Sequence, residues 1–258
     1  METSVVEKSN RKVEVLPDFE ALSLRAASIF VSASRNSIAT RKRFAVAISG
    51  GSTPRRLYML LGSEAYRHGV DWKHVHIFWA DERCVPKEDE ASNFRTALDT
   101  LLSKVALPDK NIHRIKGEET PDKAARDYGE EIRRFFGESE RPRFDLIILG
   151  VGEDGHTASL FPGSKSLEET TRLAIPVYLE ETKKNRITLT LPVLNNAAQI
   201  LFLVTGPSKA AALSEIFGEA ERRKLLPAGM INPGHGEAIW LIDHEAAGKL
   251  RGSHFQWH

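Results

Sequence analysis

The sequence predicts an α/β fold built on a mostly parallel β-sheet. Short, nearly continuous apolar runs recur along the chain, as is typical of strands that are covered on both faces. Amphipathic segments with helix-start signals separate these runs. Strands and helices therefore alternate, which favours right-handed crossovers between parallel strands.

Six apolar runs are the predicted strands, and several of them contain almost no polar residue. The runs are Phe44–Ile48, Val75–Trp79, Phe144–Leu149, Ile187–Leu191, Ile200–Val204 and Ala238–Ile242. Ligands of such sheets bind at the loops that follow the carboxyl ends of the strands. We therefore expect the chemistry of this protein in the loops after these runs.

Five segments before or between the runs carry start signals of helices. A capping Asp18 or Ser92 precedes two of them, and a proline in the first turn opens others. The expected helices are Phe19–Ser34, one opened by Thr53-Pro54, Asn93–Leu102, one from Thr120-Pro121 to about Phe136, and Lys209–Phe217 after Gly206-Pro207-Ser208.

Length, charge and cysteine content limit the class of protein. We expect one domain over residues 12–258, preceded by a short mobile segment over residues 1–11. The 36 Lys and Arg nearly balance the 35 Asp and Glu, so nothing in the net charge predicts nucleic acid or a membrane surface as partner. No apolar run approaches the ~18 residues of a membrane span, and Cys84 has no partner for an internal disulfide, which predicts a cytoplasmic protein.

The loop after the first predicted strand is predicted to hold a phosphate. Gly50 and Gly51 let the backbone turn sharply, while Ser52 and Thr53 add hydroxyls at the N-terminus of a helix, where free N–H groups bind anions. This is not a Walker A loop, since Gly-Lys-Ser/Thr is absent. The alternatives are an ordinary strand-to-helix turn and a serine-hydrolase elbow, which Ala47 disfavours because that motif needs glycine there.

Three charged residues, Asp81, Glu82 and Arg83, follow the second predicted strand. The guanidinium of Arg83 is suited to bidentate phosphate binding, and the two carboxylates could orient it or transfer a proton. Taken alone, such a loop is more often a solvated one. Cys84 is expected to be structural rather than reactive.

The loop over residues 150–163 is the most informative stretch. It contains the pattern Gly-x-Gly-x-x-Gly, but Pro162-Gly163 follows too soon for the long helix of a dinucleotide-binding unit. Asp154 and His156 lie two residues apart within it. Because histidine is well matched to acid/base chemistry near pH 7, we predict that His156 is catalytic, against the alternative of a structural hydrogen bond.

Two further basic residues are expected near the same edge of the sheet. Arg186 begins the run that continues with Ile187, and Lys209 lies in the first turn of the last predicted helix. Each alone is more often a surface charge. His74 and His76 alternate along one strand, but no third ligand follows at a suitable spacing, so we expect no metal site.

Together these loops resemble those of the glucosamine-6-phosphate isomerase/6-phosphogluconolactonase family. The matching segments occur in family order along nearly the whole chain. They are Ser49–Pro54 (SGGSTP), Trp79–Val85 (WADERCV), Leu149–Gly163 (LGVGEDGHTASLFPG), Arg186–Pro192 (RITLTLP) and Thr205–Lys209 (TGPSK). The segment Leu149–Gly163 is highly specific to the family.

The residues after His156 favour the lactonase branch of this family. In the deaminases the loop resembles Gly-His-Ile-Ala-Phe-Asn-Glu-Pro, with an acidic residue before the proline. Phe161 stands at that place here, and a phenyl ring cannot relay the protons that deamination requires. Asp81 is retained in both branches and does not separate them.

The resemblance implies a Rossmann-like, three-layer α/β/α sandwich with a mostly parallel central sheet. It also implies hydrolysis of 6-phospho-D-glucono-1,5-lactone to 6-phospho-D-gluconate, the second step of the oxidative pentose phosphate pathway. The expected partner is the phosphosugar lactone, with no metal or organic cofactor, and the protein is expected to act as a monomer or small homo-oligomer. A glucosamine-6-phosphate deaminase or isomerase and a non-catalytic sugar-phosphate sensor stay open as alternatives.

Each site residue receives an expected role. His156 takes a proton from the water that attacks C1 and returns it to the ring oxygen, while Asp154 orients His156 or stabilises its cation. Backbone N–H groups of the Gly152–Gly155 loop receive the oxyanion. The role of Asp81 stays open. The phosphate is assigned to Gly50, Gly51, Ser52, Thr53, Arg83, Arg186 and Lys209.

Overall fold

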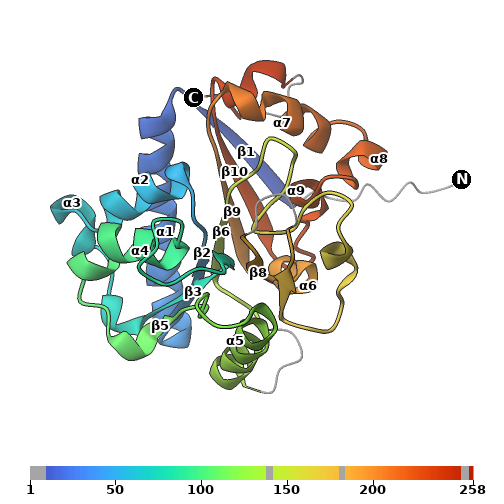
Figure 1. The fold of residues 1–258 in the computed structure, drawn as a ribbon. Coiled ribbons are helices and arrows are strands. Elements are labelled where there is room, and N and C mark those ends of the chain that lie inside the picture. Colours follow the sequence, from blue (N-terminus) through green and yellow to red (C-terminus); the bar gives the residue numbers. More distant parts are fainter. Residues whose placement is uncertain (1–9, 138–141, 180–183, 251–255, 258) are drawn as a thin grey trace, which may run out of the picture.

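The computed structural model of the 258-residue chain describes residues 10–137, 142–179, 184–250 and 256–257. Its centre is an eight-stranded sheet with the order β11-β1-β10-β9-β6-β2-β3-β5, in which all neighbours are parallel (Figure 1). The strands are β1 (Arg11–Leu16), β2 (Phe44–Ile48), β3 (Val75–Trp79), β5 (Ile112–His113), β6 (Leu146–Leu149), β9 (Gln199–Val204), β10 (Glu237–Asp243) and β11 (Gln256–Trp257). The predicted parallel sheet is confirmed.

Helices flank this sheet on both sides, so it forms the middle of three layers. In Figure 1, α1 to α4 lie to the left of the strands and α6 to α9 to the right, while α5 lies below. The helices are α1 (Phe19–Arg41), α2 (Ser52–Leu61), α3 (Glu64–Arg67), α4 (Asn93–Thr100), α5 (Pro121–Phe136), α6 (Leu191–Asn195), α7 (Ala210–Ile216), α8 (Ala220–Arg223) and α9 (Pro227–Met230).

A second, three-stranded sheet was not predicted. It consists of β4 (Asp81–Arg83), β8 (Arg186–Leu189) and β7 (Ala174–Val177), all antiparallel, in the order β4-β8-β7. The predicted strand over Ile187–Leu191 therefore belongs to this sheet and not to the central one. Ile187 and Leu189 are fully buried, and an apolar run shows burial without showing which strand it pairs with.

Helix α1 is longer than predicted. The expected end at Ser34 is wrong, because the helix continues to Arg41 and ends where Lys42 adopts a left-handed conformation, with φ of 61°. The hydroxyl of Ser34 donates to the carbonyl of Val31 at 2.8 Å, which satisfies this buried polar group inside the helix. Serine therefore does not break the helix here.

Two other helix starts differ from the expected ones. The N-cap of α2 is Gly51 rather than Thr53, so the helix begins two residues earlier, at Ser52. Gly51 has φ of 112°, which a side chain would strain. Lys209 belongs to a short 3₁₀ turn, so α7 begins at Ala210. The predicted N-cap at Ser92 is confirmed, since its side chain accepts the N–H of Arg95.

The predicted N-terminal segment lies largely outside the described residues. Of residues 1–11, only Asn10 and Arg11 are described, and Arg11 already begins β1. Strand β1 itself was not predicted, because its sequence RKVEVL alternates polar and apolar residues and lacks a continuous apolar run.

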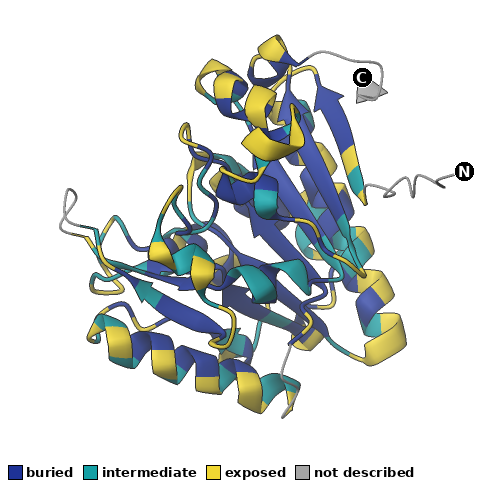
Figure 2. Cartoon of the chain, turned by 90° about the vertical axis from the view of Figure 1, so that its right-hand side faces the viewer, coloured by how far each residue is buried: buried dark blue, intermediate teal, exposed yellow. Residues whose placement is uncertain are grey.

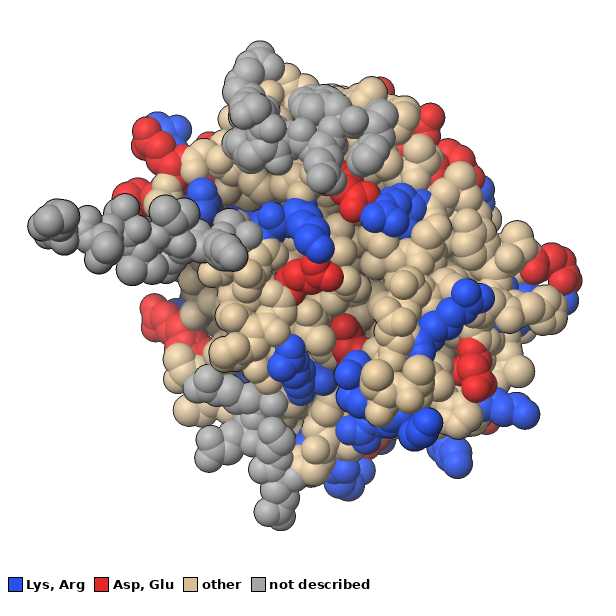
Figure 3. Space-filling model, turned by 180° about the vertical axis from the view of Figure 1, so that it is seen from behind, with Lys and Arg blue, Asp and Glu red and all other residues tan. Residues whose placement is uncertain are grey.

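The core lies on both faces of the central sheet. Every residue of β2 is at most 1% exposed, and Phe202 stacks on Trp240 of the neighbouring strand with ring centroids 3.7 Å apart. Figure 2 shows the buried strands between helices whose outer faces are exposed. Basic and acidic side chains both occur across the rear face of the molecule (Figure 3).

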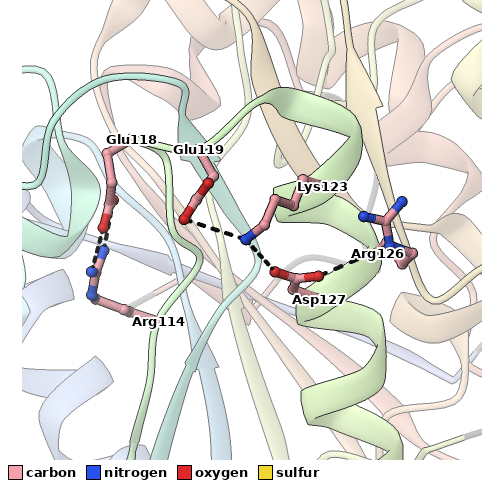
Figure 4. Close-up of polar contacts among 6 residues, drawn as sticks. All are labelled: Arg114, Glu118, Glu119, Lys123, Arg126 and Asp127. Carbon is pink, nitrogen blue, oxygen red and sulfur yellow. Dashed lines mark hydrogen bonds and ion pairs between the residues drawn. The ribbon is translucent and has the colours of Figure 1, made fainter.

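Several ion pairs lie on the segment before α5 and on the first turns of that helix (Figure 4). Arg114 binds Glu118 through two hydrogen bonds, and Lys123 lies between Glu119 and Asp127 at 3.3 and 2.9 Å. Such exposed pairs contribute little to stability. Within the described ranges, no helix has both the length and the apolar character needed to cross a bilayer.

Candidate active site

A cavity of about 380 Å³ opens where several loops meet at the carboxyl edge of the central sheet. It is bordered by the loops that follow β2, β6 and β9, together with β4 and β8. Ten of the twelve predicted site residues line it, whereas Asp154 and Gly155 do not. The ten are Gly50, Gly51, Ser52, Thr53, Asp81, Arg83, Gly152, His156, Arg186 and Lys209.

The loop before α2 presents the N-terminus of a ten-residue helix to the cavity. The hydroxyls of Thr53 and Thr205 are hydrogen-bonded at 2.8 Å, which ties this loop to the loop after β9. Ser49 is buried, and its hydroxyl donates to the carbonyl of Ile148 at 2.8 Å. Its hydroxyl therefore has a structural use, in agreement with the rejected serine-hydrolase alternative.

Arg83 and Arg186 are adjacent cations of the cavity wall, because they are paired across β4 and β8. The buried Nε of each has no hydrogen-bond partner among the described residues. Burial and the neighbouring Arg83 lower the pKa of Arg186. Within the described part of the chain, neither of them nor Lys209 forms an ion pair with a carboxylate. Nη1 of Arg83 donates to the carbonyl of Ala91 at 2.6 Å, which leaves its positive charge available to an anion together with Arg186 and Lys209.

Glu82 was expected to orient Arg83 or to transfer a proton, but its contacts are structural. It is 2% exposed, does not line the cavity, and accepts the backbone N–H groups of Asn93 and Phe94 at 2.8 Å each. It also accepts the N–H of Arg83 and the hydroxyl of Ser92. Although burial raises the pKa of Glu82, these donors satisfy its carboxylate at the start of α4.

The pair of His156 and Asp154 is the titratable centre of the third loop. Nδ1 of His156 lies 2.6 Å from Oδ1 of Asp154, and the same oxygen accepts the His156 backbone N–H at 3.1 Å. Partial burial opposes ionisation of Asp154, but the hydrogen bonds and charge of His156 lower its pKa overall. Nε2 of His156 has no partner within the described residues and is available to substrate.

Two neighbours restrict the position of the imidazole. The ring of Phe161 packs against it with centroids 4.8 Å apart. A Cβ atom at Gly152 would lie only 2.1 Å from His156 Nδ1 and 2.5 Å from Asp154 Oδ1. This position therefore requires glycine for close approach.

The expected oxyanion role of Gly152 and Gly155 is not supported. The N–H of Gly152 donates to the carbonyl of His156 at 2.8 Å, and that of Gly155 donates to the carbonyl of Gly152 at 3.0 Å. Both groups are therefore used within the loop itself. Gly155 has φ of 80° and packs against Leu226, so it shapes the loop instead.

The polar residues of the cavity that sequence reasoning did not select as site residues include Asn93 and Ser159. Ser159 lies within the matching motif, and its hydroxyl donates to Asp81 at 2.7 Å. Asn93 follows the N-cap of α4, where an asparagine normally indicates only helix capping, and its amide donates to the carbonyl of Asp81 at 2.9 Å.

The remaining candidates are structural. Burial, followed by the charge of Glu82, raises the pKa of Cys84 to about 11, which keeps the thiol protonated. His76 pairs with His113 at 3.1 Å, outside the cavity. The described segments contain no group of three His, Cys, Asp or Glu residues able to hold a metal ion.

The fold and this cavity define a sugar-phosphate enzyme class, and comparison with known families agrees. The model of the family described as glucosamine-6-phosphate isomerases/6-phosphogluconolactonase matches residues 17–240. The chain therefore belongs to this family.

The similar curated proteins are named lactonases. The 6-phosphogluconolactonase of Synechocystis sp. is 39% identical over 243 residues, covering 93% of this chain and 98% of that protein. A probable 6-phosphogluconolactonase of Arabidopsis thaliana is 35% identical, covering 94% of this chain and 95% of its own.

Solved structures show the same fold. The 6-phosphogluconolactonase of Trypanosoma brucei superposes with a TM-score of 0.82 at 26% identity, over 95% of this chain and all of that one. A monomeric glucosamine-6-phosphate deaminase, 20% identical over 93% of this chain and all of that one, superposes with a TM-score of 0.77 and supports the fold alone.

Proposed function

We propose that this protein is a 6-phosphogluconolactonase, which hydrolyses 6-phospho-D-glucono-1,5-lactone to 6-phospho-D-gluconate in the oxidative pentose phosphate pathway. The observation that carries the proposal is one cavity with two functions. It holds a histidine paired with a carboxylate, and it holds Arg83, Arg186 and Lys209 without carboxylate partners in the described chain.

The cations and the α2 N-terminus bind the phosphate of the substrate. A dianionic phosphate suits both the backbone N–H groups of Gly51 to Thr53 and a pair of adjacent guanidinium groups. Its binding energy positions the distant lactone carbonyl against His156, which offsets the entropy lost in the transition state.

His156 acts as the general base and then as the general acid. Because Asp154 accepts the Nδ1 proton, Nε2 carries the lone pair in the neutral ring. Nε2 takes a proton from water as the water oxygen bonds to C1. It returns that proton to the ring oxygen as the C1–O bond breaks, which gives 6-phosphogluconate.

Phe161 favours this reaction over deamination. It packs directly on the imidazole of His156, where it contributes no proton-transfer group. A glucosamine-6-phosphate deaminase must move protons at several atoms, and His156 is the only ionisable side chain of this described loop that lines the cavity.

The test follows acid release from freshly prepared 6-phosphogluconolactone in weak buffer, corrected for spontaneous hydrolysis. Rapid acceleration, with no ammonia released from glucosamine 6-phosphate, supports the proposal. Ammonia release without acceleration of lactone hydrolysis identifies a deaminase. Binding of sugar phosphates without either reaction identifies a sensor.

We further propose that the protein works in the cytoplasm, as a monomer or small homo-oligomer, with no nucleic acid or membrane partner. The near-neutral charge of the chain supports the absence of a nucleic-acid or anionic-membrane partner. Some relatives from rice and Arabidopsis are named as chloroplastic proteins, so fractionation of the source cells is the direct test.

A further inference from the structure

Asp81 differs from the other buried carboxylates of the described chain because it alone borders the cavity. Five carboxylate side chains are buried there, each at most 9% exposed. They are Glu14, Asp81, Glu82, Asp145 and Asp243.

The other four have partners that explain their burial. Each pairs with an arginine or accepts backbone N–H groups at a turn or helix start. Glu14 pairs with Arg25, Asp145 with Arg41 and the N–H of Ala45, Glu82 accepts from Asn93 and Phe94, and Asp243 accepts from Gly206 and Ala246.

Asp81 has only neutral side-chain donors. Its Oδ2 accepts the hydroxyl of Ser159 at 2.7 Å, and its Oδ1 accepts the amide of Asn93 at 3.3 Å. No Lys, Arg or His of the described segments lies within ion-pair distance of it. A carboxylate accepts about four hydrogen bonds, so acceptor capacity is left on the side of the cavity.

The two donors are themselves held in place. The N–H of Ser159 donates to the buried hydroxyl of Thr188 at 3.2 Å, and the preceding Ala158 has a left-handed backbone, with φ of 49°. Asn93 is anchored through its own N–H to Glu82. The carboxylate of Asp81 is therefore fixed in direction before any ligand binds.

We propose that Asp81 accepts a hydrogen bond from a hydroxyl on the carbon chain of the phosphosugar lactone, a group that the open-chain product keeps, with Ser159 and Asn93 as positioning residues. This rests on the proposed function, whose substrate brings both a phosphate and hydroxyl donors to the cavity. Asp81 feels the charge of Arg186 but forms no direct ion pair with it in the described chain. A buried carboxylate without a direct ion pair is unfavourable unless hydrogen bonds compensate it, and a bound polyol supplies a further donor. Asp81 then distinguishes polyhydroxylated phosphates from phosphates that lack hydroxyls.

Calorimetric binding of two probes, 6-phosphogluconate and inorganic phosphate, tests the proposal. In Asp81→Asn we expect 6-phosphogluconate to bind about 10- to 100-fold more weakly, the usual effect of losing a hydrogen bond to a charged group. Inorganic phosphate keeps its affinity within about threefold or binds more tightly, because a negative charge has been removed. Loss of charge alone would strengthen the binding of both anions, so selective weakening reports the lost hydrogen bond.

Two further variants separate this role from a structural one. Asp145→Asn changes a matched buried carboxylate outside the cavity, and we expect lower thermal stability with both affinities kept. Ser159→Ala keeps the Asp81 carboxylate but removes its donor, and we expect a selective loss for 6-phosphogluconate of about 3- to 10-fold. If Asp81→Asn does not fold, the affinities of Ser159→Ala for 6-phosphogluconate and inorganic phosphate give the same comparison.

Unchanged binding of 6-phosphogluconate in both cavity variants, or equal weakening of both probes, would overturn the assignment of Asp81. Lactone hydrolysis by the wild-type preparation is measured in parallel. An inactive wild type contradicts the proposed function, whereas the binding comparison still tests Asp81 separately.

Discussion

Nδ1 of His156 lies 2.6 Å from Oδ1 of Asp154, and both residues belong to one tight loop after β6. The same carboxylate oxygen also holds the backbone N–H of His156. This arrangement fixes the ring orientation and the tautomer, so that Nε2 is the atom available to a water molecule.

Replacement of Asp154 should impair turnover rather than binding. Asp154→Asn removes the charge that stabilises the imidazolium formed during proton transfer, and we expect kcat to fall about 10²- to 10⁴-fold. KM should stay within about threefold, because Asp154 does not line the cavity. Initial rates of lactone hydrolysis measure both constants, and an unchanged kcat would contradict the orienting role.

Gly152 should be required for the His156–Asp154 contact. In Gly152→Ala the added methyl group would overlap both partners, since its Cβ would lie 2.1 Å from His156 Nδ1. We expect kcat to fall by about 10²-fold or more through displacement of the imidazole. Gly248→Ala is the control, because its Cβ would meet no atom within 4 Å and it lies outside the cavity. Equal kcat in the two variants would refute this requirement.

Arg186 should contribute to phosphate affinity and not to stability. Because its guanidinium has no carboxylate partner in the described chain and lies beside Arg83, Arg186→Gln should fold as stably as wild type without ligand. We expect KM to rise about 10- to 100-fold, the effect of one charge-assisted hydrogen bond. Inorganic phosphate should raise the melting temperature of wild type more than that of the variant. Equal increases in melting temperature for wild type and variant would show that Arg186 does not bind the phosphate.

Stability should decrease on mild acidification because of the His76–His113 pair. Burial, with the neighbouring His113 and Arg43, lowers the pKa of His76 to about 4, and burial lowers that of His113. The unfolded chain takes up these protons near pH 6.5, so the unfolded state binds more protons between about pH 6.5 and 4. The free energy of unfolding therefore falls as the pH falls through that window.

His76→Leu should remove part of this dependence. Denaturant unfolding at about pH 7 and about pH 5 measures the change for both proteins. The variant should lose less stability than wild type between the two values. The same loss in both would show that this pair does not cause the effect.

The sequence predicted the parts of the fold that depend on local pattern. The run at β2 is apolar throughout, and the run at β3 is apolar except for His76. The capping signals at Ser92 and before Pro121 mark real helix starts. The antiparallel sheet could not be predicted, because pairing of β4 with β8 joins segments that are far apart in the chain. Periodicity carries no information on such pairing.

In the candidate site, too, the residues set by local pattern could be predicted, whereas those set by contacts between distant segments could not. Residues of one loop, such as Asp154 and His156, were recognisable from their spacing. Ser159 and Asn93 act through contacts with Asp81 that exist only after three distant segments meet. The N–H groups of Gly152 and Gly155, expected to receive the oxyanion, are used by hydrogen bonds within the loop, which spacing does not show.

The most direct test of the central claim compares wild type and His156→Ala on freshly generated 6-phosphogluconolactone. We predict rapid hydrolysis by wild type and a decrease of about 10²- to 10⁴-fold in kcat for the variant. Binding of 6-phosphogluconate should change by less than about threefold, since the phosphate contacts remain. Full turnover by His156→Ala would contradict the assignment of His156 as the catalytic base.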